Sequence, residues 1–357
     1  MEKVGLIIQG PLTSFGKSGA SAARKLNLSA DGKEEDGLVR YDCRPNIQRI
    51  IDDFGSLFSA VVVSTWDNEL KPGDGWKDVT IVSMPDPGGA MDTSPRAYKA
   101  HNRNRQFIGI QNGVEWLEKN SDPSYVVFMR TDQYLNLREL LDSFGRHMRR
   151  NIPGMICVPF MRPGIFLPSD FYFASELKTM KKFLDAQFSY DRYEFIVDVH
   201  RDMVLKYAHS LFRDTLRVPD WAYFPRDPSS GISKQTRTIF ARMLGTVFVP
   251  LSLRTLQSVE WRGSALSQDY MKSVATEEDL PVDVSKNRGV TGISIPALFS
   301  IDWKRYYGFC EIANHAAPSW KENCSIMFGE IGWNVWIMLQ GGMRTIKRIR
   351  TRIFKGI

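Results

Sequence analysis

Arginine, threonine and aspartate follow directly on an apolar segment near the middle of the chain. The segment is Tyr125 to Met129, and Arg130, Thr131 and Asp132 come after it. Such an apolar run predicts a buried strand, and ligands bind beyond the carboxyl ends of strands in open α/β sheets. A carboxylate there can hold a divalent cation or a sugar hydroxyl, and a planar guanidinium can bind phosphate. One alternative is a strand that turns into solvent and caps a helix, and another is an internal Arg130–Asp132 ion pair.

The first predicted strand, Val4 to Ile8, ends at Gln9, Gly10 and Pro11. In a nucleotide-binding sheet, the base and ribose would lie beside these residues. Gly10 would allow the backbone to approach a ligand closely. An ordinary tight turn is the equal alternative.

Thr65, Trp66 and Asp67 follow another predicted strand, at 60–64, which lies between the other two in the chain. The indole could stack on a base while the neighbouring polar groups bond the ribose, although tryptophan in such a place often anchors a loop on the core. Parallel strands bring like ends together, so we expect the residues after all three strands to meet at one edge.

A helix predicted at 102–116 carries further polar groups. Asn102 shares a face with Arg105 or Gln106, because residues three and four apart are neighbours on a helix. That face could bind sugar or phosphate. A solvated polar surface is the alternative.

Apolar segments alternate with helix-like segments through the first half of the chain. This alternation predicts βαβ units and an α/β fold with a mainly parallel sheet. Further predictions are a helix at 44–58, strands at 78–83 and 154–159, a helix at 183–211, and loops at 11–37 and 161–175. From about 219 to 290 the periodicity fades. We divide the chain into a nucleotide-binding half at 1–150, an acceptor-binding half at 151–330 and a tail at 331–357.

The bulk composition restricts the class of protein. The 357 residues are 43% hydrophobic and 24% charged, which favours a globular fold over disorder or a coiled coil. The four cysteines form no CxxC pair and are too few for a disulfide framework, which fits a reducing compartment. We expect no signal peptide, and no window reaches the roughly 18 apolar residues that span a bilayer. The net charge of +7 suits an anionic partner.

Several short motifs together resemble the WavE family of lipopolysaccharide-synthesis proteins. In chain order they are Ile7-Ile-Gln-Gly-Pro11, Arg49-Ile-Ile with Val61-Val-Val-Ser-Thr-Trp66, Asp86-Pro87, Asn102-Arg-Asn-Arg-Gln106, Met129-Arg-Thr-Asp132 and Ser169-Asp170-Phe171. The resemblance covers about residues 4–175. It implies a GT-A-like glycosyltransferase that moves a sugar from a nucleotide-sugar donor to a surface glycan or lipid-linked precursor, at the cytoplasmic face of the inner membrane.

The resemblance also implies a metal, which this chain supports only in part. GT-A enzymes hold Mg²⁺ or Mn²⁺ with an Asp-x-Asp motif, whereas the corresponding residues here are Thr131 to Tyr134, with Asp132 as their one carboxylate. Asp132 could still bind the metal if waters and phosphate oxygens complete the shell. Without a metal, Arg130, Arg103 and Arg105 are the cations available to the diphosphate.

Sugar transfer with inversion requires a base near the acceptor hydroxyl. Asp170 is the first candidate, and N-capping of a following helix is its alternative role. Glu194, Asp198 and His200 are other candidates on the next helix, with His200 more typical of a structural or surface residue. A retaining transfer requires no such base.

The chain ends in a basic segment at 343–357. Its isoleucines fall close to one helical face and its arginines and lysines have no acidic neighbours, which predicts an amphipathic helix on an anionic membrane surface. The alternative is a terminal helix docked on the core.

Two other function classes compete with sugar transfer. A phosphotransferase is disfavoured because the chain lacks a GxxxxGK[ST] loop. A non-catalytic membrane- or nucleic-acid-binding protein would depend on the basic tail, but the positive charge gathers at one end, away from the polar strand ends. We therefore expect no nucleic-acid partner.

Overall fold

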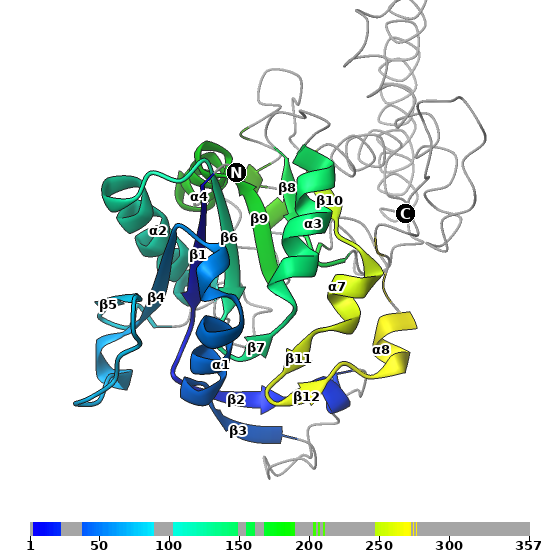
Figure 1. The fold of residues 1–357 in the computed structure, drawn as a ribbon, viewed down its shortest axis with the longest axis horizontal. Coiled ribbons are helices and arrows are strands. Elements are labelled where there is room, and N and C mark those ends of the chain that lie inside the picture. The colour runs from blue at the N-terminus through cyan, green and yellow to red at the C-terminus, as the bar shows by residue number, and fades with distance from the viewer. Residues whose placement is uncertain are drawn as a thin grey trace, which may run out of the picture. The chain divides into compact units, whose positions relative to one another are not determined.

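The protein is an α/β fold built on a mainly parallel sheet, as predicted (Figure 1). The computed structural model describes residues 3–22, 38–88, 103–148, 155–160, 168–189, 203–204, 206–207, 210, 247–272, 274 and 276. Within these ranges the main sheet has seven strands, in the order β10-β8-β9-β6-β1-β4-β5. Their bounds are β1 Val4–Gln9, β4 Ala60–Trp66, β5 Thr80–Met84, β6 Tyr125–Arg130, β8 Ile156–Val158, β9 Tyr172–Glu176 and β10 Phe248–Pro250.

The register of the central strands decides where their ends lie. β1 pairs in parallel with β4 and with β6, and Gln9 stands opposite both Ser64 and Arg130. The residues after the three strands therefore share one edge of the sheet, which confirms that prediction. β9 is antiparallel to both β6 and β8, so its amino end lies at the same edge.

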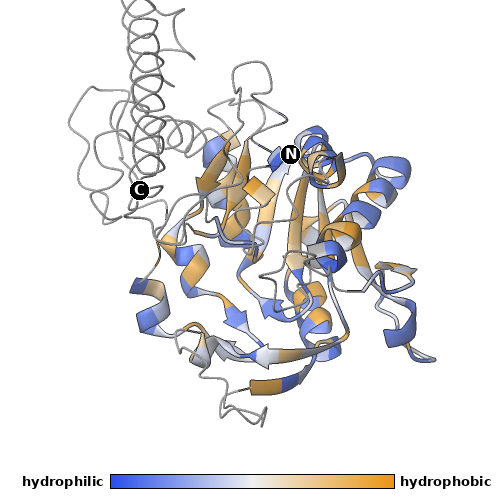
Figure 2. Ribbon diagram, turned by 180° about the vertical axis from the view of Figure 1, so that it is seen from behind, coloured by the Kyte–Doolittle hydropathy of each residue, from blue (hydrophilic) through white to orange (hydrophobic). Residues whose placement is uncertain are grey.

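Helices cover both faces of the sheet (Figure 1). α2 (Arg103–Asn120) and α4 (Leu177–Ser189) pack together on one face, where Phe107 meets Phe183 at 5.9 Å between ring centroids. α1 (Arg44–Phe54) and α3 (Leu137–Met148) contribute Ile47 and Leu140 to the core on the other face. Figure 2 shows the same arrangement, with apolar strands between helices that are apolar on one side only.

Glycines allow α2 to approach β1 closely. A Cβ atom at Gly113 would lie 2.6 Å from Cγ2 of Ile7, and one at Gly109 would lie 2.5 Å from Cγ of Gln9. Real Cβ atoms essentially never come this close, so the helix can lie at this distance only because both positions lack a side chain.

Two small sheets lie beside the main one. β2 (Thr13–Lys17) pairs with β3 (Leu38–Asp42), and β11 (Glu260–Trp261) lies between β7 (Gln133–Tyr134) and β12 (Ser264–Ala265). Along the chain, the short helix α7 (Leu253–Gln257) precedes β11 and the short helix α8 (Gln268–Lys272) follows β12.

Some sequence predictions of loops and boundaries were wrong. The segment 11–37 contains β2, and the predicted loop at 161–175 contains most of β9. The helix expected to begin at residue 183 begins at Leu177. Both strands gain their hydrogen bonds from segments distant in the chain, which local periodicity does not record.

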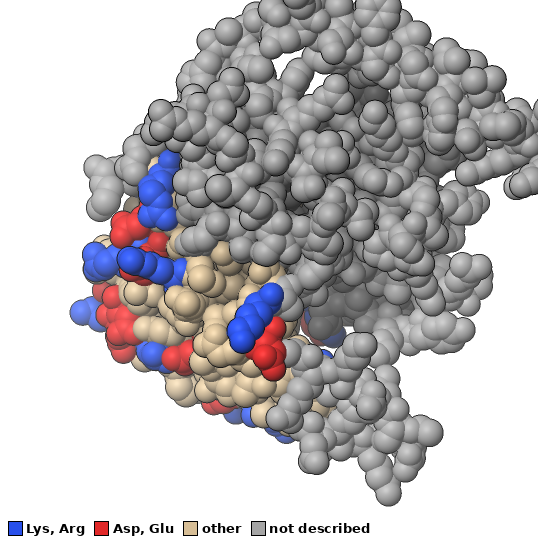
Figure 3. Space-filling model, turned by 90° about the vertical axis from the view of Figure 1, so that its right-hand side faces the viewer, with Lys and Arg blue, Asp and Glu red and all other residues tan. Residues whose placement is uncertain are grey.

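Strands from both sides of residue 150 belong to the main sheet. The division into two halves thus describes order along the chain rather than two separate sheets. The basic tail at 331–357 lies outside the described residues. In the part of the chain that the structure describes, no helix is long and apolar enough to cross a membrane. On the face that Figure 3 shows, acidic and basic side chains lie among one another where the surface is described.

Candidate functional site

Gln9 and Gly10 form the turn at the end of β1. Gln9 is buried and donates from Nε2 to the carbonyl of Arg105 at 3.2 Å, so its side chain fixes the first turn of α2. Gly10 has φ +139 and donates its N–H to the carbonyl of Ser64 at 3.0 Å. A side chain at Gly10 would meet Oγ1 of Thr131 at 2.7 Å, and that hydroxyl donates to the carbonyl of Pro11. The tight turn is present, and binding by these residues stays a prediction.

The end of β4 contributes mostly buried groups. Trp66 is 2% exposed and lies in the core, as the loop-anchor alternative expects. Thr65 is fully buried, and its Oγ1 has no hydrogen-bond partner among the described residues. Asp67 is exposed at the start of a short 3-10 helix. Stacking of a base on Trp66 would require the indole to leave the core.

The described residues of the predicted polar face of α2 contact two different segments of the chain. Arg105 forms a two-point ion pair with Asp86, Nε to Oδ1 and Nη2 to Oδ2, both at 2.7 Å. Gln106 donates from Nε2 to the backbone carbonyl of Asp170 at 3.1 Å. Asn102 and the side chain of Arg103 lie outside the described residues.

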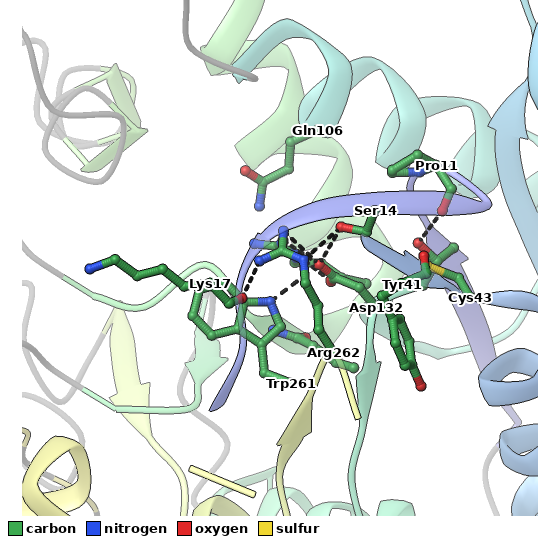
Figure 4. Close-up of polar contacts among 12 residues, drawn as sticks. Pro11, Ser14, Lys17, Tyr41, Cys43, Gln106, Asp132, Trp261 and Arg262 are labelled. Atoms are coloured by element: carbon green, nitrogen blue, oxygen red, sulfur yellow. Dashed lines mark hydrogen bonds and ion pairs between the residues drawn. The ribbon is translucent and has the colours of Figure 1, made fainter. Parts of the chain in front are cut away.

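Asp132 is the centre of a polar cluster at this edge (Figure 4). Its side chain is 3% exposed. Arg130 donates to both carboxylate oxygens, from Nε at 3.0 Å and from Nη2 at 2.9 Å. Oδ2 also accepts from Oγ of Ser14 at 2.9 Å and from Nε1 of Trp261 at 3.2 Å, and it pairs with Nη2 of Arg262 at 3.1 Å. The internal ion pair considered from the sequence is therefore present, and a second arginine joins it.

The backbone around Asp132 is held by α1. Asn46 donates from Nδ2 to the carbonyls of Thr131 at 2.9 Å and Gln133 at 2.7 Å, on both sides of the aspartate. A proline in the first turn starts α1, which directs Asn46 toward this turn.

Charges within the cluster act on one another. Burial alone would raise the pKa of Asp132, but Arg130 and Arg262 outweigh it and hold that pKa below its usual value of 3.8. Burial would lower the pKa of Arg130, and the negative charges of Asp132 and Asp170 reverse this, so its pKa is raised. Burial dominates at Arg262, whose pKa is lowered. Both arginines stay cationic and Asp132 stays anionic at neutral pH.

Asp170 lies close enough to Arg130 for its charge to act on the guanidinium. Helix N-capping does not explain its position, because the segment that follows is strand β9. Ser169 is buried and accepts from the N–H of Phe171 at 3.3 Å, so the serine shapes the turn. Asp198, Glu194 and His200 lie outside the described residues.

The donor set at Asp132 does not fit a divalent cation as it stands. Oδ1 already accepts an N–H group from Arg130, and Oδ2 accepts from both Arg130 and Arg262, so a metal would have to displace these guanidiniums. Among the described residues, no group of three or more His, Cys, Asp or Glu side chains could hold a metal ion. Metal binding by Asp132 stays a prediction.

Sequence reasoning missed Ser14, Trp261 and Arg262. Ser14 lies in β2, which was expected to be loop, and the other two lie in the region of weak periodicity. The dipeptide Arg262-Gly263 between two short polar-apolar pairs was the available signal, since a glycine there is typical of a two-residue hairpin turn.

Comparisons with known proteins gave structural similarities at low identity. No family model and no curated protein sequence matches the chain. A mannose-1-phosphate geranyltransferase structure from Thermus thermophilus is similar with a TM-score of 0.30 and 10% identity, over 58% of this chain and 68% of that one. HddC from Yersinia pseudotuberculosis in complex with GMP-PN has a TM-score of 0.27 and 9% identity, over 50% of this chain and 78% of that one. A second structure of HddC gives 0.27 and 10%, over 56% and 84%. Similarity at this level carries no information on activity, so the function proposed for this chain rests on its own residues.

Proposed function

We propose that the protein is a GT-A-like glycosyltransferase that moves a sugar from a nucleotide-sugar donor to a surface-glycan or lipid-linked glycan precursor. The observation that carries the proposal is the meeting of polar residues from four segments at one edge of the sheet. Thr131 bonds the carbonyl of Pro11 at 2.7 Å, Gln106 bonds that of Asp170 at 3.1 Å, and Arg130 pairs in register with Gln9. Ligands of open α/β sheets bind at this edge.

Arg130 supplies the positive charge that a diphosphate requires. Its Nη1 has no hydrogen-bond partner within the described residues, and its side chain is 25% exposed. When the bond between the anomeric carbon and the phosphate oxygen breaks, its electron pair stays with the nucleoside diphosphate. A fixed guanidinium stabilises that developing charge.

Asp170 is the proposed base. The acceptor hydroxyl oxygen forms the new bond to the anomeric carbon, and its proton passes to the Asp170 carboxylate. The carbonyl of Asp170 accepts from Gln106 at 3.1 Å, and the charge of Asp170 acts on Arg130, so the residue lies at the same edge of the sheet as the proposed diphosphate site. This favours the role, because acceptor and departing diphosphate must lie on either side of the same sugar. Asp198 is kept as the second candidate from the sequence.

The nature of the acceptor is proposed from the WavE resemblance, several of whose motifs are in contact in the fold. Arg105 pairs with Asp86, Gln106 bonds the Asp170 carbonyl, and Thr131 bonds the Pro11 carbonyl. The same resemblance, with the basic tail, supports a location at the cytoplasmic face of the plasma membrane.

Thermal unfolding with a panel of nucleotides and sugar nucleotides tests donor binding, each with and without Mn²⁺. The proposal expects one sugar nucleotide to raise the unfolding temperature more than its free nucleotide does. Asp170→Asn should retain that shift and lose transfer, whereas the exposed control Asp142→Asn should retain both. No shift with any sugar nucleotide, together with binding of DNA, would favour the non-catalytic alternative.

Membrane association is tested by deleting residues 343–357. The full chain should sediment with vesicles that contain anionic lipid, and the truncated chain should stay in the supernatant. Equal sedimentation of the two would remove the proposed membrane role of the tail and leave the transferase proposal untouched.

A further inference from the structure

Arg262 occupies a backbone position that arginine rarely adopts. It is the first residue of the two-residue turn between β11 and β12, with φ +47, and Gly263 follows with φ +74. Positive φ at both turn residues favours asparagine or glycine, because a Cβ atom crowds the following carbonyl. An unfavourable conformation of this kind persists where surrounding contacts impose it, and it is typical of functional positions.

The contacts that impose it all come from the site. The Arg262 N–H donates to the carbonyl of Asp132 at 2.8 Å. Its guanidinium donates from Nε to Oγ of Ser14 at 2.9 Å and from Nη1 to the carbonyl of Lys17, while Nη2 pairs with the Asp132 carboxylate (Figure 4). The side chain is 8% exposed and its Cζ lies 4.9 Å from the Trp261 ring centroid. The backbone nitrogen and all three guanidinium nitrogens of Arg262 therefore have partners within the protein.

Arg130 uses only two of its three guanidinium nitrogens in hydrogen bonds to the described residues. Its Nε and Nη2 face the Asp132 carboxylate, and the remaining Nη1 belongs to a side chain that is three times as exposed as that of Arg262, 25% against 8%. A pair made of Arg130 and Asp132 alone would be neutral. Arg262 adds a second positive charge to the same carboxylate, so these three groups carry a net charge of +1. The Asp170 carboxylate, whose charge also acts on Arg130, brings the four groups to zero, and without Arg262 they would carry a net charge of −1.

We propose that Arg262 is a positioning residue whose charge balances Asp132, so that Arg130 can bind the diphosphate of the donor. This inference rests on the proposed function and deepens it. Asp132 orients Arg130 through two hydrogen bonds, and Arg262 holds Asp132 in place. The ligand class is a pyrophosphate group, whose oxygens would bond Nη1 of Arg130.

Calorimetric titration of the full chain with inorganic pyrophosphate tests the inference. Arg130→Gln should abolish binding, and Arg262→Gln should weaken it by about tenfold or more, because the groups around Arg130 then carry a net negative charge. Arg262→Lys keeps the charge and should bind more tightly than Arg262→Gln. Arg49→Gln is the matched control: Arg49 is 48% exposed and pairs with Glu260 rather than Asp132, so binding should be unchanged.

Equal affinities of the Arg262→Gln and Arg49→Gln variants would overturn the inference, and so would wild-type affinity in Arg130→Gln or a wild-type chain that binds no pyrophosphate. Arg130→Gln keeps the inference testable if Arg262→Gln does not fold. The two proposals can fail separately. If the chain binds a sugar nucleotide equally well with and without Arg262, only the positioning role of Arg262 is wrong. If pyrophosphate binding depends on Arg262 but no sugar nucleotide binds, only the transferase proposal is wrong.

Discussion

Replacing Asp132 by asparagine should destabilise the folded chain strongly. The carboxylate is 3% exposed and is the shared partner of Arg130 and Arg262. Removing one member of a buried charge pair costs about 3 to 5 kcal/mol, because the opposite charge stays buried without compensation. In either orientation the amide NH2 would also face a donor: Nε of Arg130 at the Oδ1 position, or Ser14 and Trp261 at the Oδ2 position.

Urea unfolding followed by far-UV circular dichroism measures the effect. With an m-value of about 3 kcal/mol/M, the midpoint should fall by about 1 to 1.7 M. Asp53→Asn is the matched control, since Asp53 is 44% exposed and accepts from the Tyr134 hydroxyl at 2.7 Å. A pair at this exposure contributes less than about 1 kcal/mol.

The effect should also depend on pH in a defined direction. The pKa of Asp132 is lower in the folded chain than its usual value of 3.8, so its stabilisation is complete above that value. It is lost as the pH falls below 3.8 and through the depressed folded pKa. The difference in free energy of unfolding between wild type and Asp132→Asn should therefore be constant near neutrality and shrink in acid.

Equal midpoints for Asp132→Asn and Asp53→Asn at pH 7 would refute this reasoning. They would mean that Asp132 serves a ligand more than the fold, as its position at the end of an apolar strand alone suggests. That simpler argument expects Asp132→Ala to stay folded and lose transfer. The two views therefore differ in the stability of the variant rather than in its activity.

Two further predictions concern the core. Gly113→Ala should destabilise by about 1 to 3 kcal/mol because the new methyl meets Ile7 at 2.6 Å, whereas Gly145→Ala, with no atom within 4 Å of its Cβ, should stabilise by about 0.5 to 1 kcal/mol in thermal unfolding. Cys43 is buried, and burial raises its thiol pKa to about 12. Mass spectrometry should find Cys43 alkylated by iodoacetamide at pH 8 only after unfolding, and rapid native modification would contradict this.

The central strands were predictable because their signal is local. β1, β4 and β6 are continuous apolar runs that end in polar residues, and the rule that parallel strands share an edge then places Gln9 beside Arg130. The observed bounds extend the predicted strands by one or two residues at their carboxyl ends. The polar residues at these ends therefore belong to the sheet's hydrogen-bond ladder as well as to the candidate site.

The completion of the site was not predictable from such patterns. β2 contains Ser14, Gly16 and Lys17, a composition typical of loops, and it is a strand only because β3 supplies its partner. The contacts of Asp132 with Ser14 and Trp261 join residues 118 and 129 positions apart. The local pattern of apolar and polar residues holds no information on contacts between residues that are this far apart in the chain.

The double attachment of Arg262 explains why stability and function should be linked at this edge. Its backbone N–H bonds the Asp132 carbonyl while its guanidinium bonds the Asp132 carboxylate, so the β11–β12 turn and the end of β6 are joined at two points. Asn46 holds the end of β6 from α1, because its side chain donates to the carbonyl of Thr131. A movement of the hairpin would therefore release Asp132 and, through it, the orientation of Arg130. Substitutions in this turn should change pyrophosphate affinity and the free energy of unfolding together, whereas substitutions at the exposed Lys181–Glu118 pair between α4 and α2 should leave pyrophosphate affinity unchanged.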